Sequence, residues 1–561
     1  MTATRAPLCL LVDNASDPAA LRRLLPGGRG HLVLVTSQKP LADLAGDGAD
    51  LYALGPLPPS AAYSYLTNCL GQARLTAEPE PTDRLIALTA GVPLALWLTV
   101  AQLARHPDRP VASVVRSLLE SQRRATASPT APRLTGVIVS PHLDTAYAEL
   151  SRDAARYYRY LALLPVHDID ASLADALTTG GRHDASSVLS ALAAAHLLEA
   201  APPHDLRGAV YRWPSAEVRE HARQRALAEA TDGETAEVLR RALGWALTAA
   251  AAADALVTRS HSQSLPDPRP RPGFTTPFQD KAAALSWLKA QAANLLALIR
   301  AAHGAGEYEL AWRITWALWP WWRADKRYGE WIEIHRLALD AVQRCQNPAA
   351  ELRILNTLGL GLRGTRDLDE AIGHFQQVRE RARHLKDRYM EAQALHELGC
   401  TYVEADKLPK ARPFLREASE IRLDLGYTRG VALTDIILGQ IAYQLHDFGQ
   451  ASRLFSDARA TLLDEDDPHD AARALAWRGR VSTFMGDIAT AEDTLRAAHD
   501  EFLTVQAPNW AARTLEWLGE AAQRDNRIPD AITCYTQALD RYQLLDARDA
   551  ERLRTRLRDL S

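Results

Sequence analysis

Apolar and small side chains recur every forty residues between Arg353 and Glu551. Within one forty-residue unit the apolar positions follow helical spacing over two stretches, which a polar turn such as Glu404–Lys407 separates. Each unit is therefore predicted to be a helical hairpin whose apolar faces are buried only when successive units stack. Small residues would let the two helices of a unit approach closely, and a bulky residue would fill the space toward the next unit. The four columns hold glycine (Gly359, Gly399, Gly439, Gly479, Gly519), alanine (Ala371, Ala411, Ala451, Ala491, Ala531), a bulky apolar residue (Phe375, Leu415, Phe455, Leu495, Tyr535) and a small residue (Val378, Ala418, Ala458, Ala498, Ala538).

The N-terminal stretch follows another pattern, with two short runs of consecutive apolar residues. Leu8–Asp13 ends in an acid, and His31–Ser37 ends in two hydroxyl side chains. Continuous apolar runs of this length are typical of buried strands in a parallel sheet. Asp17 followed by Pro18 predicts a helix that begins between the two runs. We therefore expect a strand–helix–strand unit of an α/β fold, which places ligands at the C-terminal ends of its strands.

The middle of the chain is predicted to be helical up to a proline-rich segment. Tyr157–Pro165 is an aromatic and aliphatic helix that a proline ends, and Ser187–Glu199 is a second helix. The second helix offers almost none of the Arg, Lys, Asn or Gln side chains that a DNA-reading helix needs, so we expect it to pack within the protein. Residues 264–273 carry proline at every second position and are predicted to form an extended, semi-rigid linker.

Composition and charge exclude several classes of function. The net charge is −4 and the sequence pI is about 6.5, which gives no global electrostatic case for binding nucleic acid or an acidic membrane. No run approaches twenty uninterrupted apolar residues, and the N-terminus lacks the layout of a signal peptide. The scattered cysteines contain no C-x-x-C pair, which fits a reducing cytoplasm, so a cytoplasmic protein without membrane contact is expected. They are Cys9, Cys69, Cys345, Cys400 and Cys534.

The forty-residue unit resembles the tetratricopeptide repeat. Leu398–Tyr402 reads L-G-C-T-Y, which matches the L-G-x-x-Y element of that family, and alanine, bulky and small columns follow at the family's relative positions. Arg478 before Gly479, and the absence of an aromatic residue at Ser482 and Ala522, depart from the pattern. The unit is longer than the usual repeat and is similar to the longer-helix form of bacterial signalling regulators. The resemblance implies a superhelical array that binds partners.

The N-terminal half resembles the NB-ARC branch of the STAND signalling ATPases. Leu10–Ala15 looks like the Walker B strand, Val33–Ser37 like the sensor strand, and Ala90–Leu96 like the G-x-P-L-A-L element, whose proline lies against adenine. Residues 143–230 look like the winged helix of this family, and Leu285–Leu295 resembles the helix that joins such modules to repeat arrays. By this resemblance alone, the nucleotide-binding residues would be Asp13, Asn14, Thr36, Ser37, Gly91 and Pro93.

Four phosphate-facing features of that family are missing. No Gly-Lys dipeptide occurs in the chain and only a few residues precede Leu8, so the P-loop that cradles the phosphates is absent. The sensor arginine is replaced by Gln38, the second acid of the Walker B element by Asn14, and the family's M-H-D by Trp213–Ser215. The module is expected to be an inactive NTPase remnant without a cofactor. ADP or ATP with Mg²⁺ would bind only if a P-loop were supplied.

One column of the repeat is predicted to face the concave groove of the array. Arginine side chains there suit carboxylates on a partner, which makes an acidic or C-terminal-carboxylate peptide the expected ligand. The alternative is a solvated inner face. The column six residues before each repeat glycine holds Arg353, Gln393, Leu433, Arg473 and Arg513, and other groove-facing places hold Asn356, Arg363, His396, Gln440, Tyr443, Arg480 and Gln523.

Tryptophans crowd the segment that precedes the repeats. Trp312, Trp316 and Trp319 have the spacing of one helix face, and Trp321 and Trp322 follow directly. The favoured interpretation is a dry junction between the linker and the array. The alternative is an aromatic pocket for a ligand. No metal-ligand spacing or catalytic motif is present, so neither a metal site nor a catalytic residue is predicted.

These patterns predict a mainly α protein with a C-terminal tetratricopeptide-type solenoid, preceded by a winged-helix domain and a small α/β remnant of a nucleotide-binding domain. The expected function is a STAND-like regulatory protein that is not an enzyme and acts by protein–protein interaction, with oligomer formation left open. One alternative is an ATP/ADP-dependent switch whose P-loop lies upstream or in another chain, and another is a structural scaffold. The predicted domains are 1–66 (partial nucleotide-binding), 67–134 (helical ARC subdomain), 135–230 (winged helix), 231–280 (helix and linker), 281–346 (helical junction with a degenerate repeat) and 347–561 (tetratricopeptide repeats).

Overall fold

The computed structural model describes residues 7–13, 15, 17–26, 30–37, 41–126, 134–177, 184–204, 207–258, 276–545 and 547–560. Asn14 and the predicted linker 264–273 lie outside the described residues. The chain divides into two compact units, one of residues 1–151 with 195–197 and the other of residues 152–194 with 198–561. Each unit is described by itself.

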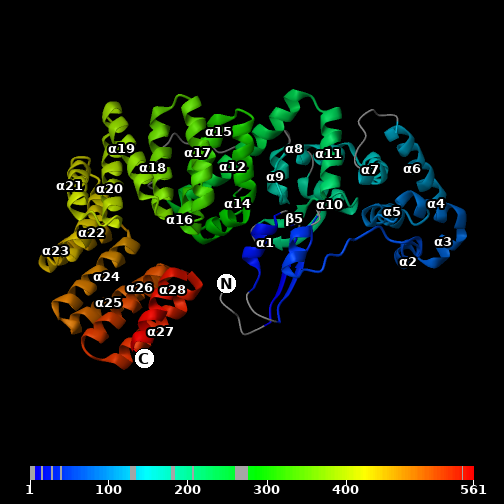
Figure 1. The fold of residues 1–561 in the computed structure, drawn as a ribbon. Helices are drawn as coiled ribbons and strands as arrows, with labels where there is room; N and C mark the ends of the chain where they lie inside the picture. Colours follow the sequence, from blue (N-terminus) through cyan, green and yellow to red (C-terminus); the bar gives the residue numbers. More distant parts are fainter. Residues whose placement is uncertain are drawn as a thin grey trace. The chain divides into compact units, whose positions relative to one another are not determined.

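The first unit begins with the predicted strand–helix–strand element. Strands β1 (Cys9–Val12) and β2 (Leu32–Val35) pair in parallel, with Cys9 opposite Leu32, and α1 (Pro18–Leu24) lies between them in sequence (Figure 1). The side chain of Asp17 accepts a hydrogen bond from the Ala19 backbone N–H, as expected of an N-cap. The prediction of a parallel pair is confirmed, and a short 3₁₀ helix, η1 (Ala42–Asp47), follows.

Six helices complete the part of the first unit that the structure describes. Prolines occupy the first or second position of α2, α4 and α5, where a missing N–H costs no hydrogen bond. Helix α7 packs against α4, α5 and α6 and so lies with the helices that precede it. Their bounds are α2 (Pro59–Leu70), α3 (Gln72–Ala77), α4 (Pro79–Thr89), α5 (Pro93–Arg105), α6 (Val111–Thr126) and α7 (Leu134–Ala148).

The second unit begins with helices around a small antiparallel sheet. Its strands lie in the order β3–β5–β4. Helix α11 packs on α8, where the Tyr158 hydroxyl donates to the Val218 carbonyl at 2.9 Å. The elements are α8 (Arg152–Leu163), β3 (Ile169–Asp170), α9 (Ala171–Ala176), α10 (Ala185–Ala194), β4 (Glu199–His204), β5 (Gly208–Arg212) and α11 (Ala216–Glu229).

Within residues 232–258 and 276–344, five helices lead into the repeats. Among the described residues, only α14 has the length and composition of a membrane-crossing helix, and 56% of its apolar window is buried within the protein. Its packing against α12, α15, α16 and α17 accounts for this apolar character. The bounds are α12 (Asp232–Val257), α14 (Lys281–Gly304), α15 (Tyr308–Ala317), α16 (Trp319–Asp325) and α17 (Tyr328–Arg344).

The prediction that three tryptophans share one helix face is wrong. Helix α15 ends at Ala317 and a new helix begins at Trp319, so Trp312 and Trp319 lie on different helices. Pro320 explains the break, because it has no N–H to continue the hydrogen-bond ladder and instead occupies the first turn of α16.

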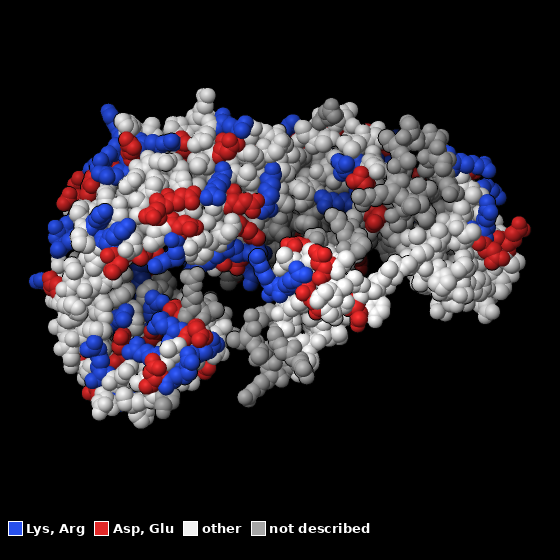
Figure 2. All heavy atoms as spheres, viewed as in Figure 1, with Lys and Arg blue, Asp and Glu red and all other residues white. Residues whose placement is uncertain are grey.

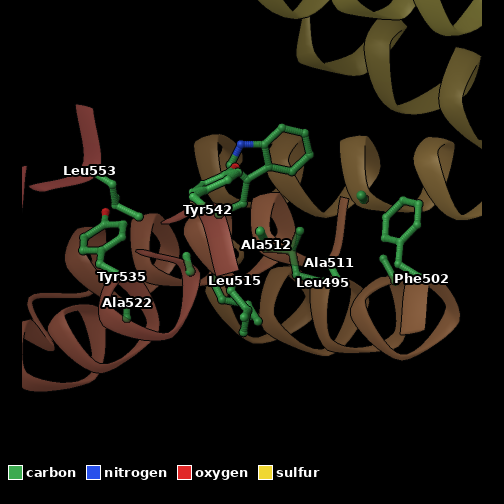
Figure 3. Close-up of a cluster of buried hydrophobic side chains, with 14 of the residues drawn as sticks. Leu495, Phe502, Ala511, Ala512, Leu515, Ala522, Tyr535, Tyr542 and Leu553 are labelled. Carbon is green, nitrogen blue, oxygen red and sulfur yellow. The ribbon is translucent and has the colours of Figure 1, made fainter. Parts of the chain in front are cut away.

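Residues 348–545 form five successive helical hairpins, and a final helix follows (Figure 1). This confirms the predicted solenoid. The last helix, α28, covers the end of the array, where its Leu553 joins Tyr535 and Tyr542 of α27 in one buried cluster (Figure 3). The hairpins are α18 (Pro348–Thr365) with α19 (Leu368–Leu385), α20 (Arg388–Glu404) with α21 (Leu408–Asp424), α22 (Thr428–Gln444) with α23 (Phe448–Asp464), α24 (Pro468–Met485) with α25 (Ile488–Thr504), and α26 (Pro508–Arg524) with α27 (Ile528–Leu545), and the covering helix is α28 (Ala547–Leu560).

Each repeat glycine lies against the bulky residue sixteen positions later. A Cβ atom at Gly399 would lie 2.6 Å from Leu415 Cδ2, and one at Gly439 would lie 2.7 Å from Phe455 Cε1. Leu415 is also buried with Ile441 of the following hairpin. The bulky column therefore joins the two helices of a hairpin and also fills the space toward the next hairpin.

The array has an additional regularity of twenty residues. Residues with positive φ occur at this step, one at the end of each successive helix. Two of them are glycines. The others carry side chains, and a backbone with a side chain adopts this left-handed conformation at some cost in free energy. They are Lys326, Gln346, Arg366, Lys386, Asp406, Gly426, His446, Asp466, Gly486, Gln506 and Asn526.

Candidate ligand-binding groove

A groove of about 740 Å³ runs along the first helices of successive hairpins, α18, α20, α22 and α24, and reaches α15, α16 and α17. Its lining carries more positive than negative side chains, although the whole chain has a net charge of −4. On the face of the repeats visible in Figure 2, by contrast, cations and carboxylates lie interspersed. The positively charged lining residues are Arg323, Lys326, Arg353, Arg363, Arg366, Arg422, Arg429 and Arg473, and the negatively charged ones are Glu397, Glu404 and Asp470.

The structure brings some of the predicted groove residues together and separates others. Those that line the groove are Arg353, Asn356, Arg363, Gln393, His396, Leu433 and Arg473. Farther along the array, Arg480 lies over the ring of Trp517, 4.8 Å from its centroid, and forms an ion pair with Glu520 at 3.3 Å. Arg513 pairs with Asp549 at 3.0 Å. The predicted residues outside the groove lining are Gln440, Tyr443, Arg480, Arg513 and Gln523.

Several arginines of the groove already hold carboxylates of the chain itself. Arg363 Nη1 lies 2.6 Å from Glu397 Oε2 and its Nε lies 3.3 Å from Glu404 Oε1. Burial acts to lower the pKa of Arg363, but these carboxylates outweigh it and raise the pKa. Arg473 pairs with Asp470 at 3.0 Å. The predicted arginine column is therefore partly neutralised.

Sequence reasoning missed Arg422, which enters the groove from the second helix of its hairpin. The residue is 2% exposed, and burial lowers the pKa of its guanidinium. Its Nη1 donates to Gly430 O at 2.8 Å and to Thr434 Oγ1 at 2.6 Å, and its Nη2 donates to Gln393 Oε1 at 2.9 Å. The sequence did contain a signal for Arg422, because this arginine stands alone in an otherwise apolar column of the repeat. The residues at the same place in the other four hairpins are Ala382, Leu462, Phe502 and Tyr542.

His396 and Cys400 lie in the groove lining as uncharged groups. Burial and the nearby cations Arg422, Arg363 and Arg473 hold the pKa of His396 well below its ordinary value. Burial, with Glu397 beside it, raises the pKa of Cys400 to about 12. A thiol with this pKa is a poor nucleophile at neutral pH. Across the described residues, no group of three or more potential metal-binding side chains occurs.

Aromatic side chains line the end of the groove nearest the junction helices. The rings of Trp319 and Trp331 lie 5.9 Å apart edge to face, and Trp331 Nε1 donates to Thr357 O at 2.8 Å. Trp316, Trp319 and Trp331 line the groove, while Trp321 and Trp322 are buried. The tryptophan segment thus forms both a buried junction and one wall of the groove.

The residues assigned to nucleotide by resemblance lie in two places. Thr36 Oγ1 donates a hydrogen bond to Asp13 Oδ1 at the C-terminal ends of β1 and β2, and Ser37 Oγ donates to Ala15 O at 2.6 Å. Gly91 has φ of 69° and meets the backbone of Leu57, since a Cβ there would lie 2.0 Å from Leu57 O.

The helix that Pro93 opens packs into the cluster that α2 and α4 share, whereas β1 adjoins the separate small cluster of Leu21, Leu41 and Leu44. Gly91 and Pro93 therefore lie with the helices α2 and α4, and Asp13 and Thr36 pair at the strand ends.

Comparisons with known proteins agree with the repeat assignment. A tetratricopeptide repeat model matches residues 350–424. The chain is 30% identical over 319 residues to the regulatory protein AfsR of Streptomyces coelicolor, which is 55% of this chain and 30% of that protein. It is 27% identical over 585 residues to AfsR of Streptomyces griseus, covering 98% of this chain and 58% of that protein. The chain thus spans about a third to just over half of the length of these relatives.

Among solved structures, a signal transduction ATPase with numerous domains and a tetratricopeptide repeat sensor, from Pyrococcus horikoshii, aligns at 16% identity and a TM-score of 0.39, over 98% of this chain and 83% of that one. A Rap protein complexed with competence and sporulation factor aligns at 13% identity and a TM-score of 0.39, over 62% of this chain and 91% of that one. The chain contains tetratricopeptide repeats and is similar in sequence to AfsR-type regulatory proteins.

Proposed function

We propose that this chain is a regulatory protein whose repeat array receives a signal by binding a protein or peptide segment in the groove. The observation that carries the proposal is the excess of cations over carboxylates in a groove of a chain that is acidic overall. The sequence similarity to regulatory proteins named AfsR supports the regulatory role. The groove residues are expected to recognise an acidic or C-terminal-carboxylate peptide rather than nucleic acid or membrane.

The partner-binding test compares two pairs of arginines from the same array. Peptides are selected from a random dodecapeptide library against the full chain, and their affinities are measured by fluorescence anisotropy. Changing Arg353 and Arg473, which line the groove, to Ala should weaken binding about tenfold or more. Changing Arg480 and Arg513, which lie outside its lining, should leave the affinity within about twofold.

Salt provides a second check on the same peptides. Binding to the wild-type chain should weaken as ionic strength rises, because part of it is Coulombic. Failure to select any peptide would contradict the proposal. Selected peptides that bind the Arg353/Arg473 variant as tightly as the wild type would also contradict it.

The N-terminal α/β piece is proposed to be a degenerate nucleotide-binding module of the NB-ARC type, followed by a winged helix made of α8 to α11. Asp13, Asn14, Thr36 and Ser37 would be what remains of the phosphate-facing residues. Without a P-loop we expect the purified chain to carry no ADP and not to hydrolyse ATP. Stoichiometric ADP released on denaturing the purified chain would contradict this.

The alternative, an ATP/ADP-dependent switch completed by a P-loop from another segment, has support from exposed apolar strands. The side chains of Leu11, Leu32 and Leu34 are 67%, 54% and 50% exposed, although parallel strands are ordinarily covered on both faces. Additional strand–helix units, whose helices pack on the faces of the sheet, would cover them. A longer protein that contains this chain and a P-loop, and that copurifies with ADP, would favour this alternative.

A further inference from the structure

Arg422 is a buried cation that holds only neutral groups of the chain. Its hydrogen-bond acceptors are the carbonyl of Gly430, the hydroxyl of Thr434 and the amide oxygen of Gln393. Among the described residues, no carboxylate lies within ion-pair distance of its guanidinium. Glu397 acts on Arg422 only from beyond that distance, and burial outweighs it and lowers the pKa of the guanidinium. Burying a charge without a direct ion pair is costly, so a protein retains such a group where something else compensates.

The repeat fold itself does not require a cation at this position. The corresponding positions of the other hairpins hold apolar residues that are all buried. Leu462 is the closest in size of these residues to the aliphatic part of an arginine. An apolar side chain therefore satisfies the packing of the array, and the charge of Arg422 needs an explanation outside the fold.

Arg422 also fills a gap in the row of groove cations. The column that supplies Arg353 from α18 and Arg473 from α24 holds the uncharged residues Gln393 and Leu433 on the two helices between. Arg422 reaches this place from α21 and is held there by Gln393. A row of three arginines thus extends along the groove from α18 to α24. Arg353 and Arg473 lie 4.0 Å and 3.0 Å from the carboxylates of Asp387 and Asp470, whereas Arg422 has no carboxylate within ion-pair distance among the described residues.

Two further observations show that the groove lining is short of hydrogen-bond partners. Arg422 uses three of its five N–H groups within the described chain, which leaves one on Nε and one on Nη2. Asn356 is 6% exposed, lines the same groove and has a buried side-chain oxygen without a hydrogen-bond partner. Buried polar groups are ordinarily satisfied, so the Asn356 oxygen points to a ligand that supplies a donor, and the two remaining N–H groups of Arg422 are available to the same ligand.

We propose that Arg422 is the anchor for one carboxylate of the ligand that occupies the groove. The inference rests on the proposed function, because it requires a ligand there. The carboxylate accepts hydrogen bonds from the remaining Nε and Nη2 groups, while Thr434 and Gln393 hold the guanidinium in place. In this water-poor setting a charge-assisted pair is stronger than an exposed ion pair. The low pKa of His396, set by burial and three arginines, fits a positive potential at this point.

The experiment pairs a change in the protein with a change in the ligand. The probes are the peptides selected from the random library against the full chain, each synthesised with every Asp, Glu and C-terminal carboxyl replaced in turn by its amide. For the wild-type chain, one such replacement should weaken binding about tenfold or more. For Arg422→Gln, the same replacement should change the affinity less than about twofold, because the group that distinguishes acid from amide is gone.

Matched variants separate this contact from a loss of fold. Arg422→Lys keeps the charge and should retain a preference for the acid. Arg429→Gln is the control, since Arg429 lines the same groove but already pairs with Asp467 at 2.5 Å, and it should leave the acid-to-amide ratio unchanged. If Arg422→Gln does not fold, Arg422→Leu, which reproduces the residue of the next hairpin, replaces it.

The outcomes distinguish this inference from the proposed function. Peptides that bind the groove with the same acid-to-amide ratio in the wild type and in Arg422→Gln would overturn the anchor and leave the proposed function intact. Selection of no peptide, or of peptides indifferent to Arg353 and Arg473, would overturn both.

Discussion

At the scale of single residues, the repeat array depends on glycines that face rings and leucines. Gly439→Ala would place a Cβ atom 2.7 Å from Phe455 Cε1 and 2.9 Å from its Cζ. The ring is fully buried and cannot move aside freely, so the variant should lose about 1–3 kcal/mol of local stability. Native-state hydrogen exchange should report the loss in α22, α23 and the adjoining hairpins, since each repeat contacts only its neighbours.

Gly373→Ala is the matched control for that variant. Gly373 lies inside helix α19, and apart from its chain neighbours and the backbone of its own helix no atom would lie within 4 Å of a Cβ added there. Alanine is the better helix former, so this variant should gain about 0.5–1 kcal/mol of stability. Equal effects of the two substitutions would refute the close-contact explanation of the glycine column.

Asp435 should make the stability of the array depend on pH. Burial, with the like charge of Asp457 nearby, raises the pKa of Asp435 to about 6. Because the folded state then binds the proton more tightly than the unfolded state, stability should fall as pH rises from about 4 to about 6. Asp435→Asn should therefore stabilise the protein at pH 7, by roughly 1 kcal/mol after allowance for partial exposure, and have little effect at pH 4. Thermal unfolding at both pH values tests this, and an equal effect at both would contradict it.

At the scale of helices, the end of each repeat helix offers a direct test of backbone strain. Gln506 adopts φ of 54° and Gly426 adopts φ of 66° at equivalent places. Gln506→Gly should stabilise the array by about 0.5–1 kcal/mol, and Gly426→Ala should destabilise it by about 1 kcal/mol, because only glycine adopts this conformation without strain. Both effects are measurable by hydrogen exchange at the adjoining helices.

Much of the helical architecture could be predicted from periodicity, because apolar columns report which faces are buried. The twenty-residue step was hidden, since most of the residues with positive φ are not glycines. The break between α15 and α16 depends on Pro320, which the tryptophan spacing alone did not take into account.

The candidate groove could be predicted only in part. The arginine column was visible in the sequence, but the carboxylate of Glu397 that pairs with Arg363 comes from the next hairpin and depends on how the hairpins stack. Asp470, which pairs with Arg473, lies three residues earlier on the same helix and could have been read from the sequence. Arg422 was not among the predicted groove residues, because the prediction considered only the first helix of each hairpin. This side chain reaches the groove from the second helix. An arginine in an otherwise apolar column was nevertheless a usable signal.

Across the whole molecule, partner recognition is expected to occur in the groove along α18, α20, α22 and α24. The most direct measurement is hydrogen exchange of the full wild-type chain with and without a saturating peptide selected from the library. Slower exchange is expected in these four helices and in the aromatic end at α16 and α17, while α26, α27 and α28 should be unchanged. Protection confined to the N-terminal unit or to α26–α28, with none in the four groove helices, would contradict this expectation.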